Sequence, residues 1–136
     1  MQIGSGIILL STTTKRLLLA RRSDSNAWAN FGGSMEDFET TYQCVIREMK
    51  EETGFEHGVQ YRIYGKKPYH KKESGNFAYY TYIGVCDGEP VPTLDAENIA
   101  FGWFALDSLP MPLHFGVEEA LSAHAVVKIL SKLSGK

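Results

Sequence analysis

The order of hydrophobic and polar residues predicts a β-hairpin at the start of the chain. Residues 4–10 are apolar and β-branched enough to form a buried strand. A polar turn at 11–14 leads into a second apolar run over 16–21, and the two runs together predict a hairpin. Residues 23–30 are then polar and rich in turn formers, and the pair Gly32-Gly33 interrupts the pattern.

The clearest helix is predicted over residues 40–53. Its apolar positions recur at three- and four-residue spacing and form one buried stripe, made of Tyr42, Ile46, Met49 and Thr53. Thr40 or Thr41 is expected to cap the start of this helix. Gly54 follows the last turn, in the position where glycine commonly ends a helix.

The second half of the chain continues with predicted strands at 61–69 and 77–86 around a lysine-rich connection, 71–76. A short aromatic strand at 99–105, a proline-containing loop and a helix at 116–133 complete the pattern. Strands before and after the first helix, with a helix closing the chain, predict an α/β fold with a mixed sheet. No repeat, linker or low-complexity segment divides the sequence, so we expect one domain over residues 1–136.

Composition and charge exclude several classes of protein. The 136 residues are 43% hydrophobic and 22% charged, as in ordinary globular domains. The formal net charge of -2 excludes a generally basic nucleic-acid binder and a strongly acidic disordered tail. No apolar run reaches the ~18 residues of a membrane-spanning helix, and the first residues lack the basic region of a secretory signal. Cys44 and Cys86 show no pairing pattern, so we expect reduced thiols and a cytoplasmic location.

The average charge hides an acidic cluster in one segment. Residues 36–56 hold seven acids and two bases, whereas the rest of the chain holds nine acids and twelve bases. Within this segment Glu48, Glu51 and Glu52 share one helix face at i, i+3 and i+4. One interpretation is a solvated acidic face neutralised by Arg47 or Lys50. The other is a site for Mg²⁺ or Mn²⁺, which prefer oxygen ligands.

Two features beside the helix favour the metal site. The glycines at 32 and 33 allow the backbone to approach a ligand closely and leave a carbonyl free to coordinate. Glu39 precedes the helix and Arg47 lies within it, so an ion pair between them can hold the loop on the helix. Arg47 is therefore interpreted as a bidentate clamp rather than a substrate ligand.

The segment from Gly33 to Phe55 resembles the Nudix box, G-x5-E-x7-R-E-U-x-E-E-x-G-U, at every fixed position, with Met49 and Phe55 at the bulky apolar sites U. The strand residues 17–22, Trp103-Phe104 and Leu109-Pro110 resemble further stretches of MutT-type members. The sequence is thus identified as a member of the Nudix hydrolase family. This resemblance implies the family fold, an α/β/α sandwich with a mixed β-sheet, and a box that forms loop, helix and loop.

The resemblance also implies an activity and a set of site residues. Family members cleave a phosphoanhydride bond in a nucleoside diphosphate linked to another group, by attack of water on phosphorus with Mg²⁺ or Mn²⁺ as cofactor. The implied metal ligands are Glu48, Glu51, Glu52 and the carbonyl of Gly33. The implied catalytic residues are Glu39, Arg47, Glu52 and Glu97. Glu97, six residues before Trp103, is expected as base or further ligand, with Asp95 as the fallback; which acid acts as base stays open.

Substrate contacts are expected from Arg22, on a phosphate, and from Phe31, at the mouth of the site. Phe31 stands where relatives often carry proline, and Phe38 stands where they often carry glycine. A bulky residue cannot take a positive φ cheaply, so the loop around Phe38 is expected to differ. The lysines at 66, 67, 71 and 72 are interpreted as a solvated hairpin, with attraction of a polyphosphate as the alternative. Most of the aromatic side chains at 28, 77, 79, 80 and 82 are interpreted as core, with a base-stacking platform as the alternative.

The expected partner is a small nucleotide, either a nucleoside triphosphate or a nucleotide sugar. An RNA 5′-end pyrophosphohydrolase on the same scaffold is one alternative, with the lysines from 66 to 72 as its only hint. A non-catalytic Nudix-like binding or sensor domain is another, although such domains usually lose box acids that are all present here. No membrane partner is expected, and a homodimer is left open.

Overall fold

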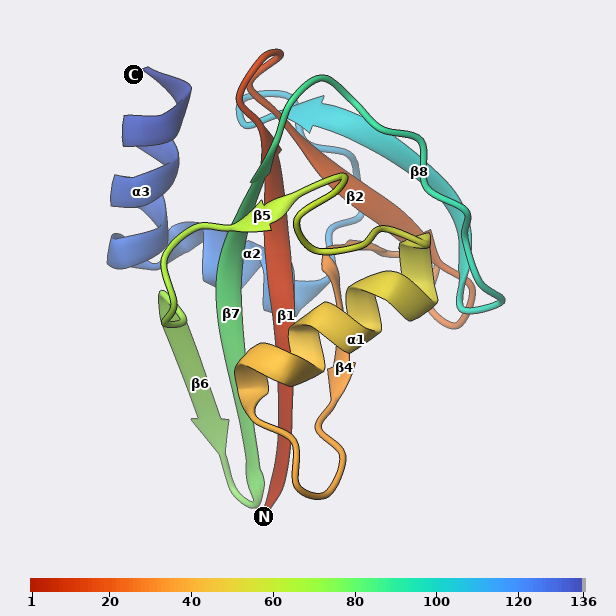
Figure 1. Ribbon diagram of the computed structural model, residues 1–136, viewed down its shortest axis with the longest axis vertical. Coiled ribbons are helices and arrows are strands. Elements are labelled where there is room, and N and C mark those ends of the chain that lie inside the picture. Colours follow the sequence, from red (N-terminus) through yellow and green to blue (C-terminus); the bar gives the residue numbers. More distant parts are fainter. Residues whose placement is uncertain (136) are drawn as a thin grey trace.

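The computed structural model describes residues 1–135, in which eight strands form one hydrogen-bonded mixed sheet (Figure 1). The strands are β1 (Gln2–Ser11), β2 (Arg16–Arg22), β3 (Trp28–Ala29), β4 (Phe31–Ser34), β5 (Arg62–Ile63), β6 (His70–Ser74), β7 (Phe77–Cys86) and β8 (Asn98–Ala105). The helices are α1 (Thr41–Thr53), α2 (Phe115–Ser122) and α3 (His124–Ser134). Their order along the chain confirms the predicted α/β class.

Strand β1 lies at the centre of the sheet. It pairs in parallel with β7 along its whole length, from Gln2 opposite Phe77 to Ser11 opposite Cys86. On its other side it pairs antiparallel with both β2 and β4. Residues 4–11 are consequently all buried, which explains why the sequence of this strand does not alternate between apolar and charged residues.

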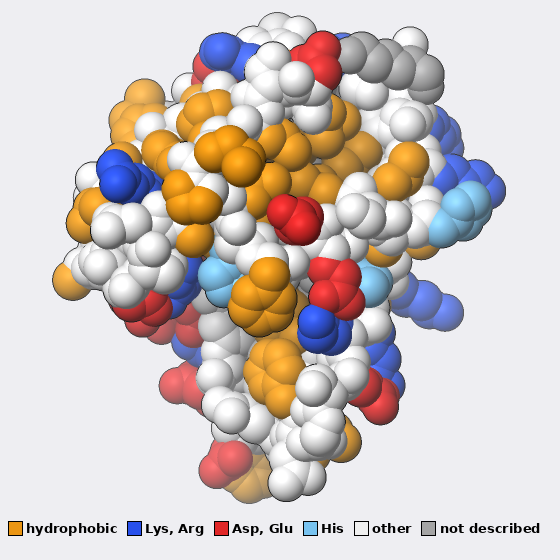
Figure 2. Space-filling view, turned by 180° about the vertical axis from the view of Figure 1, so that it is seen from behind, with side chains coloured by type: hydrophobic (Ala, Val, Ile, Leu, Met, Phe, Trp, Pro, Cys, Tyr) orange, Lys and Arg blue, Asp and Glu red, His pale blue; other side chains and the backbone are white. Residues whose placement is uncertain are grey.

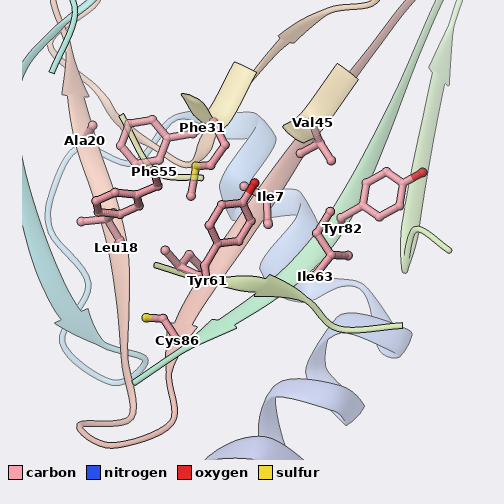
Figure 3. Close-up of a cluster of buried hydrophobic side chains, with 12 residues drawn as sticks. Ile7, Leu18, Ala20, Phe31, Val45, Phe55, Tyr61, Ile63, Tyr82 and Cys86 are labelled. Carbon is pink, nitrogen blue, oxygen red and sulfur yellow. The ribbon is translucent and has the colours of Figure 1, made fainter. Parts of the chain in front are cut away.

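Helices cover both faces of the sheet, as the alternation of side chains along β1 requires. Ile7 and Leu9 belong to a cluster that includes Val45 and Met49 of α1. Their neighbours Ile8 and Leu10 point the other way, into a cluster with residues of α2 and α3. Figure 3 shows the first cluster, with Phe31, Phe55 and Tyr61 gathered between α1 and the sheet. This arrangement confirms the expected α/β/α sandwich.

The box helix begins and ends as the sequence predicts. The Thr40 hydroxyl accepts a hydrogen bond from the Gln43 N–H, and the Gln43 side chain accepts one from the Thr40 N–H, which completes a capping box. Gly54 takes a left-handed conformation with φ 78°. The buried face differs from the predicted stripe, because Cys44, Val45 and Glu52 are also buried while Tyr42 and Ile46 are only partly buried.

Three predicted elements are wrong. The strand expected over 61–69 shrinks to β5, because Gly65, with φ 76°, and Pro68 bend the chain there. The lysine-rich connection is mostly strand β6, and the hairpin turn falls at Gly75 instead. The last helix is two helices, since Ala123 is extended between α2 and α3.

The segment 23–34, which carries no strand signal in the sequence, contains the short strands β3 and β4. Strand β4 pairs with β1, with Gly33 opposite Ser5 and Gly32 opposite Gly6. This pairing places the glycine pair beside α1. Seen from behind, the molecule has a broad hydrophobic area in its upper half, with acidic, basic and histidine side chains near the middle of the face below it (Figure 2). Among the described residues, none of the helices has both the length and the apolar character needed to cross a membrane.

Candidate active site

The two glycines of β4 allow the carboxylates of α1 to approach the backbone closely. The Gly32 N–H donates a hydrogen bond to Oε1 of Glu52 across 3.0 Å. A Cβ atom on Gly33 would lie only 2.6 Å from both carboxylate oxygens of Glu48. Any side chain at position 33 would therefore displace the Glu48 carboxylate, which accounts for the glycine at the start of the box.

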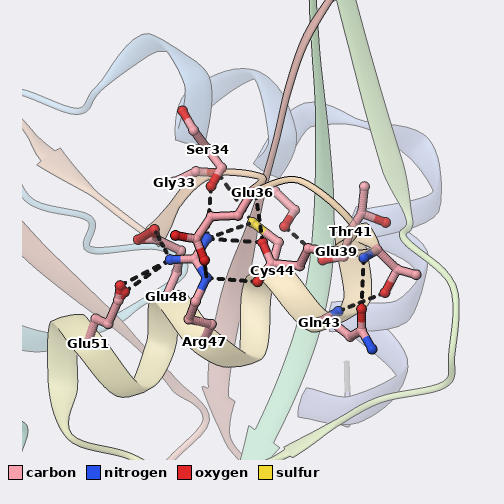
Figure 4. A network of polar contacts seen from close by, with 12 residues as sticks. Gly33, Ser34, Glu36, Glu39, Thr41, Gln43, Cys44, Arg47, Glu48 and Glu51 are labelled. Atoms are coloured by element: carbon pink, nitrogen blue, oxygen red, sulfur yellow. Dashed lines mark hydrogen bonds and ion pairs between the residues drawn. The ribbon is translucent and has the colours of Figure 1, made fainter.

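Arg47 connects the loop before α1 to the acidic face of the helix (Figure 4). Its Nε and Nη2 donate to the two oxygens of Glu39 at 2.7 and 3.0 Å, the fork expected from the sequence. Nη2 also donates to the Ser34 carbonyl at 2.9 Å. Nη1 donates to Oε1 of Glu48 and to both oxygens of Glu51, each at 3.0 Å.

These contacts keep Arg47 protonated and Glu39 ionised. Hydrogen bonding to Glu39 and to the helix carboxylates raises the pKa of Arg47 above its already high value. The same hydrogen bonds hold the pKa of Glu39 below its usual range, against a smaller opposing effect of burial. Because all three guanidinium nitrogens have acceptors within the chain, Arg47 is occupied in holding the loop and the helix together.

Glu52 lies deepest among the acids of the box, with 2% of its surface exposed. Burial, reinforced by the charges of Glu48, Asp95 and Glu97, raises the pKa of Glu52 to about 8 in spite of the Gly32 hydrogen bond. Burial also raises the pKa of Glu48. Two neighbouring carboxyls are thus costly to ionise in the protein alone.

A second acidic segment reaches Glu52 from the loop before β8. Glu52, Asp95 and Glu97 each offer a carboxylate oxygen, and these oxygens all lie within 4.8 Å of one another. Asp95 is fixed by the Glu97 N–H, which donates to its Oδ1 at 3.1 Å. Three carboxylate oxygens at this spacing form a donor set that fits a divalent cation, which would also offset their mutual repulsion.

Asp95 and Glu97 line a cavity of about 1110 Å³, together with Glu48 and Glu51 of α1. Arg22 lines it as well, with Nε and Nη2 donating to Asp24, each at 3.1 Å. The charges of Glu97 and Glu52 contribute to the raised pKa of Arg22, after the hydrogen bond to Asp24. A cavity of this size has room for a ligand as large as a nucleotide.

The structure brings most of the expected site residues together. Glu48, Glu51, Arg47, Gly33, Arg22 and Glu97 all line the cavity, and Glu52 lies with Glu97 in the acidic cluster. Glu51 is half exposed and turned towards Arg47. The Gly33 carbonyl accepts a weak hydrogen bond from the Cys44 thiol at 3.6 Å. Glu39 lies on the other side of Arg47, where it holds the guanidinium.

The expected substrate contact from Phe31 is wrong. Its side chain is 2% exposed and packs in the core with Leu18, Val45 and Met49, so it lies beneath the glycines rather than in the cavity. The expectation that Phe38 avoids a positive φ is also wrong. Phe38 does adopt the left-handed conformation that glycine would favour, with φ 65°, and its side chain is fully exposed.

Two members of the site have a place that sequence reasoning did not give them. Asp95, expected only as the fallback for Glu97, lies in the cluster together with it, and its Oδ1 accepts a hydrogen bond from the Glu97 N–H. Tyr79 of β7 lines the cavity, and a Cβ on Gly32 would lie 2.3 Å from its hydroxyl. No local pattern distinguished Tyr79 from the core aromatics around it.

A family model described as NUDIX domain matches residues 1–124. The NAD-capped RNA hydrolase NudC of Pseudomonas aeruginosa is 32% identical over 138 residues, which cover 98% of this chain and 46% of that protein. The dihydroneopterin triphosphate diphosphatase of Escherichia coli is 43% identical over 47 residues, 34% of this chain and 31% of that protein. The chain therefore spans about half the length of the NudC relatives or less.

Solved structures show the same fold. An Ap4A hydrolase from C. elegans superposes with a TM-score of 0.77 at 18% identity, covering 98% of this chain and 99% of that one. A MutT NUDIX hydrolase from Burkholderia pseudomallei gives a TM-score of 0.69 at 22% identity, covering 90% and 97%. At these identities the similarity establishes the architecture alone.

Proposed function

The chain belongs to the Nudix family, and from that membership and the geometry of its acidic cavity we propose that it is a pyrophosphohydrolase. Its substrate is a nucleoside diphosphate linked to another group, and water attacks one phosphorus of the phosphoanhydride. The observation that carries this proposal is the acidic cluster of Glu52, Asp95 and Glu97, of which Asp95 and Glu97 line a cavity large enough for a nucleotide.

Mg²⁺ or Mn²⁺ is the proposed cofactor, because its ligands here would all be oxygens. Glu52 and Asp95 would hold it, with Glu48, Glu51 and the Gly33 carbonyl as further ligands. When bound, the cation neutralises phosphate charge and makes hydroxide available near neutral pH.

The remaining residues of the site hold the carboxylates in position. The Gly32 N–H donates to Oε1 of Glu52 and so orients that carboxylate. Arg47, held by Glu39, keeps the helix carboxylates in place by hydrogen bonds to Glu48 and Glu51. Positioning of this kind supplies much of the catalysis in phosphoryl transfer, where the protein makes few covalent contributions.

Glu97 is the proposed base. It is exposed, unlike Glu52, and its carboxylate lies in the cluster on the cavity wall. An exposed carboxylate exchanges protons freely with solvent, so it can accept the proton of the attacking water and release it again. Arg22 is the proposed phosphate contact, because it lines the cavity and its pair with Asp24 uses only Nε and Nη2, not Nη1.

A small nucleotide is the proposed substrate class, and an RNA 5′ end is the second candidate. The RNA candidate rests on the 32% identity to an NAD-capped RNA hydrolase, which extends over 98% of this chain. Binding of an RNA would depend strongly on salt concentration, because the protein would have to neutralise several phosphates, whereas binding of a small nucleotide would depend on it only weakly.

We further propose a single domain over residues 1–136, of which Lys136 lies outside the described residues, and a cytoplasmic location consistent with two free, buried cysteines.

A substrate panel tests this function. Nucleoside triphosphates, nucleotide sugars, dinucleotides and a short RNA with a capped 5′ end are incubated with Mg²⁺ and then with Mn²⁺, and products are identified by mass. Hydrolysis in heavy-oxygen water shows which phosphorus is attacked. Metal-dependent release of a nucleoside phosphate from one class supports the proposal, and the absence of turnover across the panel with both cations contradicts it.

A further inference from the structure

One surface of the molecule gathers exposed lysines that the proposed site does not use. We call this surface the basic face and define it by five lysines from three segments: Lys15 just before β2, Lys66 and Lys67 in the loop after β5, and Lys128 and Lys132 on α3. All five residues are exposed. Seen from behind, basic side chains follow the right-hand edge of the molecule, which is the side of α3 (Figure 2).

Two contacts hold these three segments side by side. Lys132 Nζ donates to the Tyr64 hydroxyl at 3.4 Å, which brings α3 against the loop that follows β5. Lys15 Nζ donates to the Leu133 carbonyl at 3.2 Å, which brings the turn between β1 and β2 to the end of the same helix. Lys128 and Lys132 are four residues apart and therefore lie on one side of α3. The charges thus share one surface although the sequence separates them widely.

The lysines of the basic face have no acidic partners. Neither residues 61–72 nor residues 124–135 contain an aspartate or a glutamate. Among the described residues, no ion pair involves a lysine of this face. The other described lysines each pair with an acid: Lys50 with Glu56, Lys71 with Glu73 and Lys72 with Glu119. Like charges close together repel one another, and an anion bound across the face would offset that repulsion.

Strand β6 connects the basic face with the cavity of the proposed site. Lys67 lies three residues before His70, the first residue of β6, and both His70 and Lys72 line the cavity. The chain from Lys67 to Lys72 spans at most about 18 Å when fully extended. A polymer whose first unit lies in the cavity can therefore reach the basic face along this strand.

Aromatic rings lie among the lysines. The partly buried rings of Tyr64 and Tyr69 flank Lys66 and Lys67 in the sequence, and their centroids are 6.3 Å apart. Lysines neutralise phosphates, and aromatic rings beside them stack on unpaired bases. This combination fits a single-stranded nucleic acid better than an acidic peptide, which has no bases to stack.

We propose that the basic face binds the phosphate backbone of a single-stranded RNA whose 5′ end occupies the cavity. The inference rests on the RNA candidate of the proposed function and adds to it a surface, outside the site, for the rest of the chain. The formal net charge of -2 conceals this surface, because the acids are concentrated elsewhere in the chain. Affinity then depends on the length of the RNA and on salt, unlike the affinity for a single nucleotide.

Binding of an RNA without a 5′ phosphate tests the basic face separately from hydrolysis. Oligouridylates of about 4 and about 12 nucleotides, each with a 5′-hydroxyl end and a 3′ fluorescein, are titrated with the protein in Mg²⁺. Fluorescence anisotropy is recorded from about 50 to about 200 mM salt. The variants are Lys67→Gln, Lys128→Gln and Lys132→Gln. The matched control is Lys50→Gln, which removes one positive charge from an exposed lysine of α1 that is paired with Glu56.

The longer RNA is expected to bind more tightly than the shorter one. The logarithm of its association constant should fall with the logarithm of salt concentration at a slope of about -2 to -3.5, as for three to five neutralised phosphates of a single strand. Each of the three variants should make this slope shallower by about 0.7 and weaken binding to the same extent for other base sequences. Lys50→Gln should keep both the slope and the affinity of the unchanged protein.

Equal affinity for the two lengths would overturn the basic face, as would an unchanged slope in all three variants. Displacement of the RNA by a glutamate peptide as effectively as by unlabelled RNA of the same charge would overturn the assignment to RNA. If the longer RNA binds as expected but nothing in the substrate panel is hydrolysed, the basic face stands and the proposed hydrolysis fails. If a capped RNA is hydrolysed with the same KM at both lengths, the hydrolysis stands and the basic face fails.

Discussion

The backbone N–H of Gly32 donates a 3.0 Å hydrogen bond to Oε1 of Glu52, and this contact joins a strand of the sheet to the deepest acid of the box helix. It forms because β4 pairs with β1 in a register that places Gly32 opposite Gly6. The same strand brings Gly33 against Glu48. Because Gly32 and Gly33 have no side chains, the carboxylates of Glu52 and Glu48 can lie against the strand backbone, where they form part of the proposed site.

Gly33→Ala tests this close approach. The added methyl group would meet the Glu48 carboxylate, so the carboxylate must move away from its present position. We expect turnover to fall by about a hundredfold, while the free energy of unfolding falls by no more than about 2 kcal/mol. Ser34→Ala, one residue along the same strand, is the matched control for kcat and for thermal unfolding. Unaltered turnover in Gly33→Ala would show that the position of Glu48 is not critical.

Glu39→Gln tests the clamp through the pH dependence of stability. Because Arg47 holds the pKa of Glu39 below its usual range, the pair stabilises the fold above the ordinary glutamate pKa of about 4.3 and loses this contribution as pH falls through the lower folded value. We expect a gap in unfolding free energy between the two proteins of about 1–2 kcal/mol near neutral pH, which closes in acid.

Denaturant unfolding at a series of pH values measures that gap. Glu56→Gln is the control, because its partner Lys50 and Glu56 itself are both exposed and the pair should contribute little. A gap for Glu39→Gln that stays constant down to the acid limit would show that the stabilisation does not come from the ionised carboxylate.

Phe38→Gly is expected to stabilise the protein. Phe38 adopts φ 65° with a fully exposed side chain, so it bears the steric cost of a left-handed conformation without burying its ring. Glycine removes that cost, for a net gain of about 0.5–1 kcal/mol after its greater chain entropy in the unfolded state. Phe38→Ala is the comparison, since alanine keeps a Cβ and should gain less. A loss of stability in Phe38→Gly would point to a packing role for the phenyl ring.

The two cysteines are expected to be unreactive in the folded protein. Both are buried, burial raises the pKa of Cys44, and burial raises the pKa of Cys86 to about 12. Since only the thiolate reacts, alkylation by iodoacetamide near pH 8 should be slow before unfolding and complete after it. Mass spectrometry counts the labelled thiols in each state. Rapid labelling of the folded protein would show that a cysteine is accessible as the thiolate.

The sequence predicts the local parts of the site well. The capping box at Thr40, the terminating Gly54 and the pair of Glu39 with Arg47 all lie within one segment, so short-range spacing determines them. The same holds for the hairpin of β1 and β2, whose two apolar runs are joined by a short polar turn.

The remaining features depend on contacts between distant segments, which no local pattern specifies. The polar and glycine-rich stretch around Phe31 suggests an open loop, yet pairing of β4 with β1 turns that side chain into the core. Asp95 and Glu97 reach Glu52 only because β8 pairs with β2. The break between α2 and α3 at Ala123 involves neither glycine nor proline, the residues that commonly mark such ends.

Mg²⁺-dependent turnover of Glu52→Gln is the most direct test of the acidic centre. Glutamine keeps the size of the side chain and an oxygen that can accept from Gly32, but it removes the charge that a cation requires. Glu56→Gln, an exposed acid just after the box, is the matched control. The proposed function predicts that Glu52→Gln loses about a hundredfold to a thousandfold in kcat with an unfolding temperature equal to or above that of the unchanged protein, while Glu56→Gln is fully active. Full Mg²⁺-dependent turnover in Glu52→Gln would contradict the assignment of this carboxylate to the metal centre.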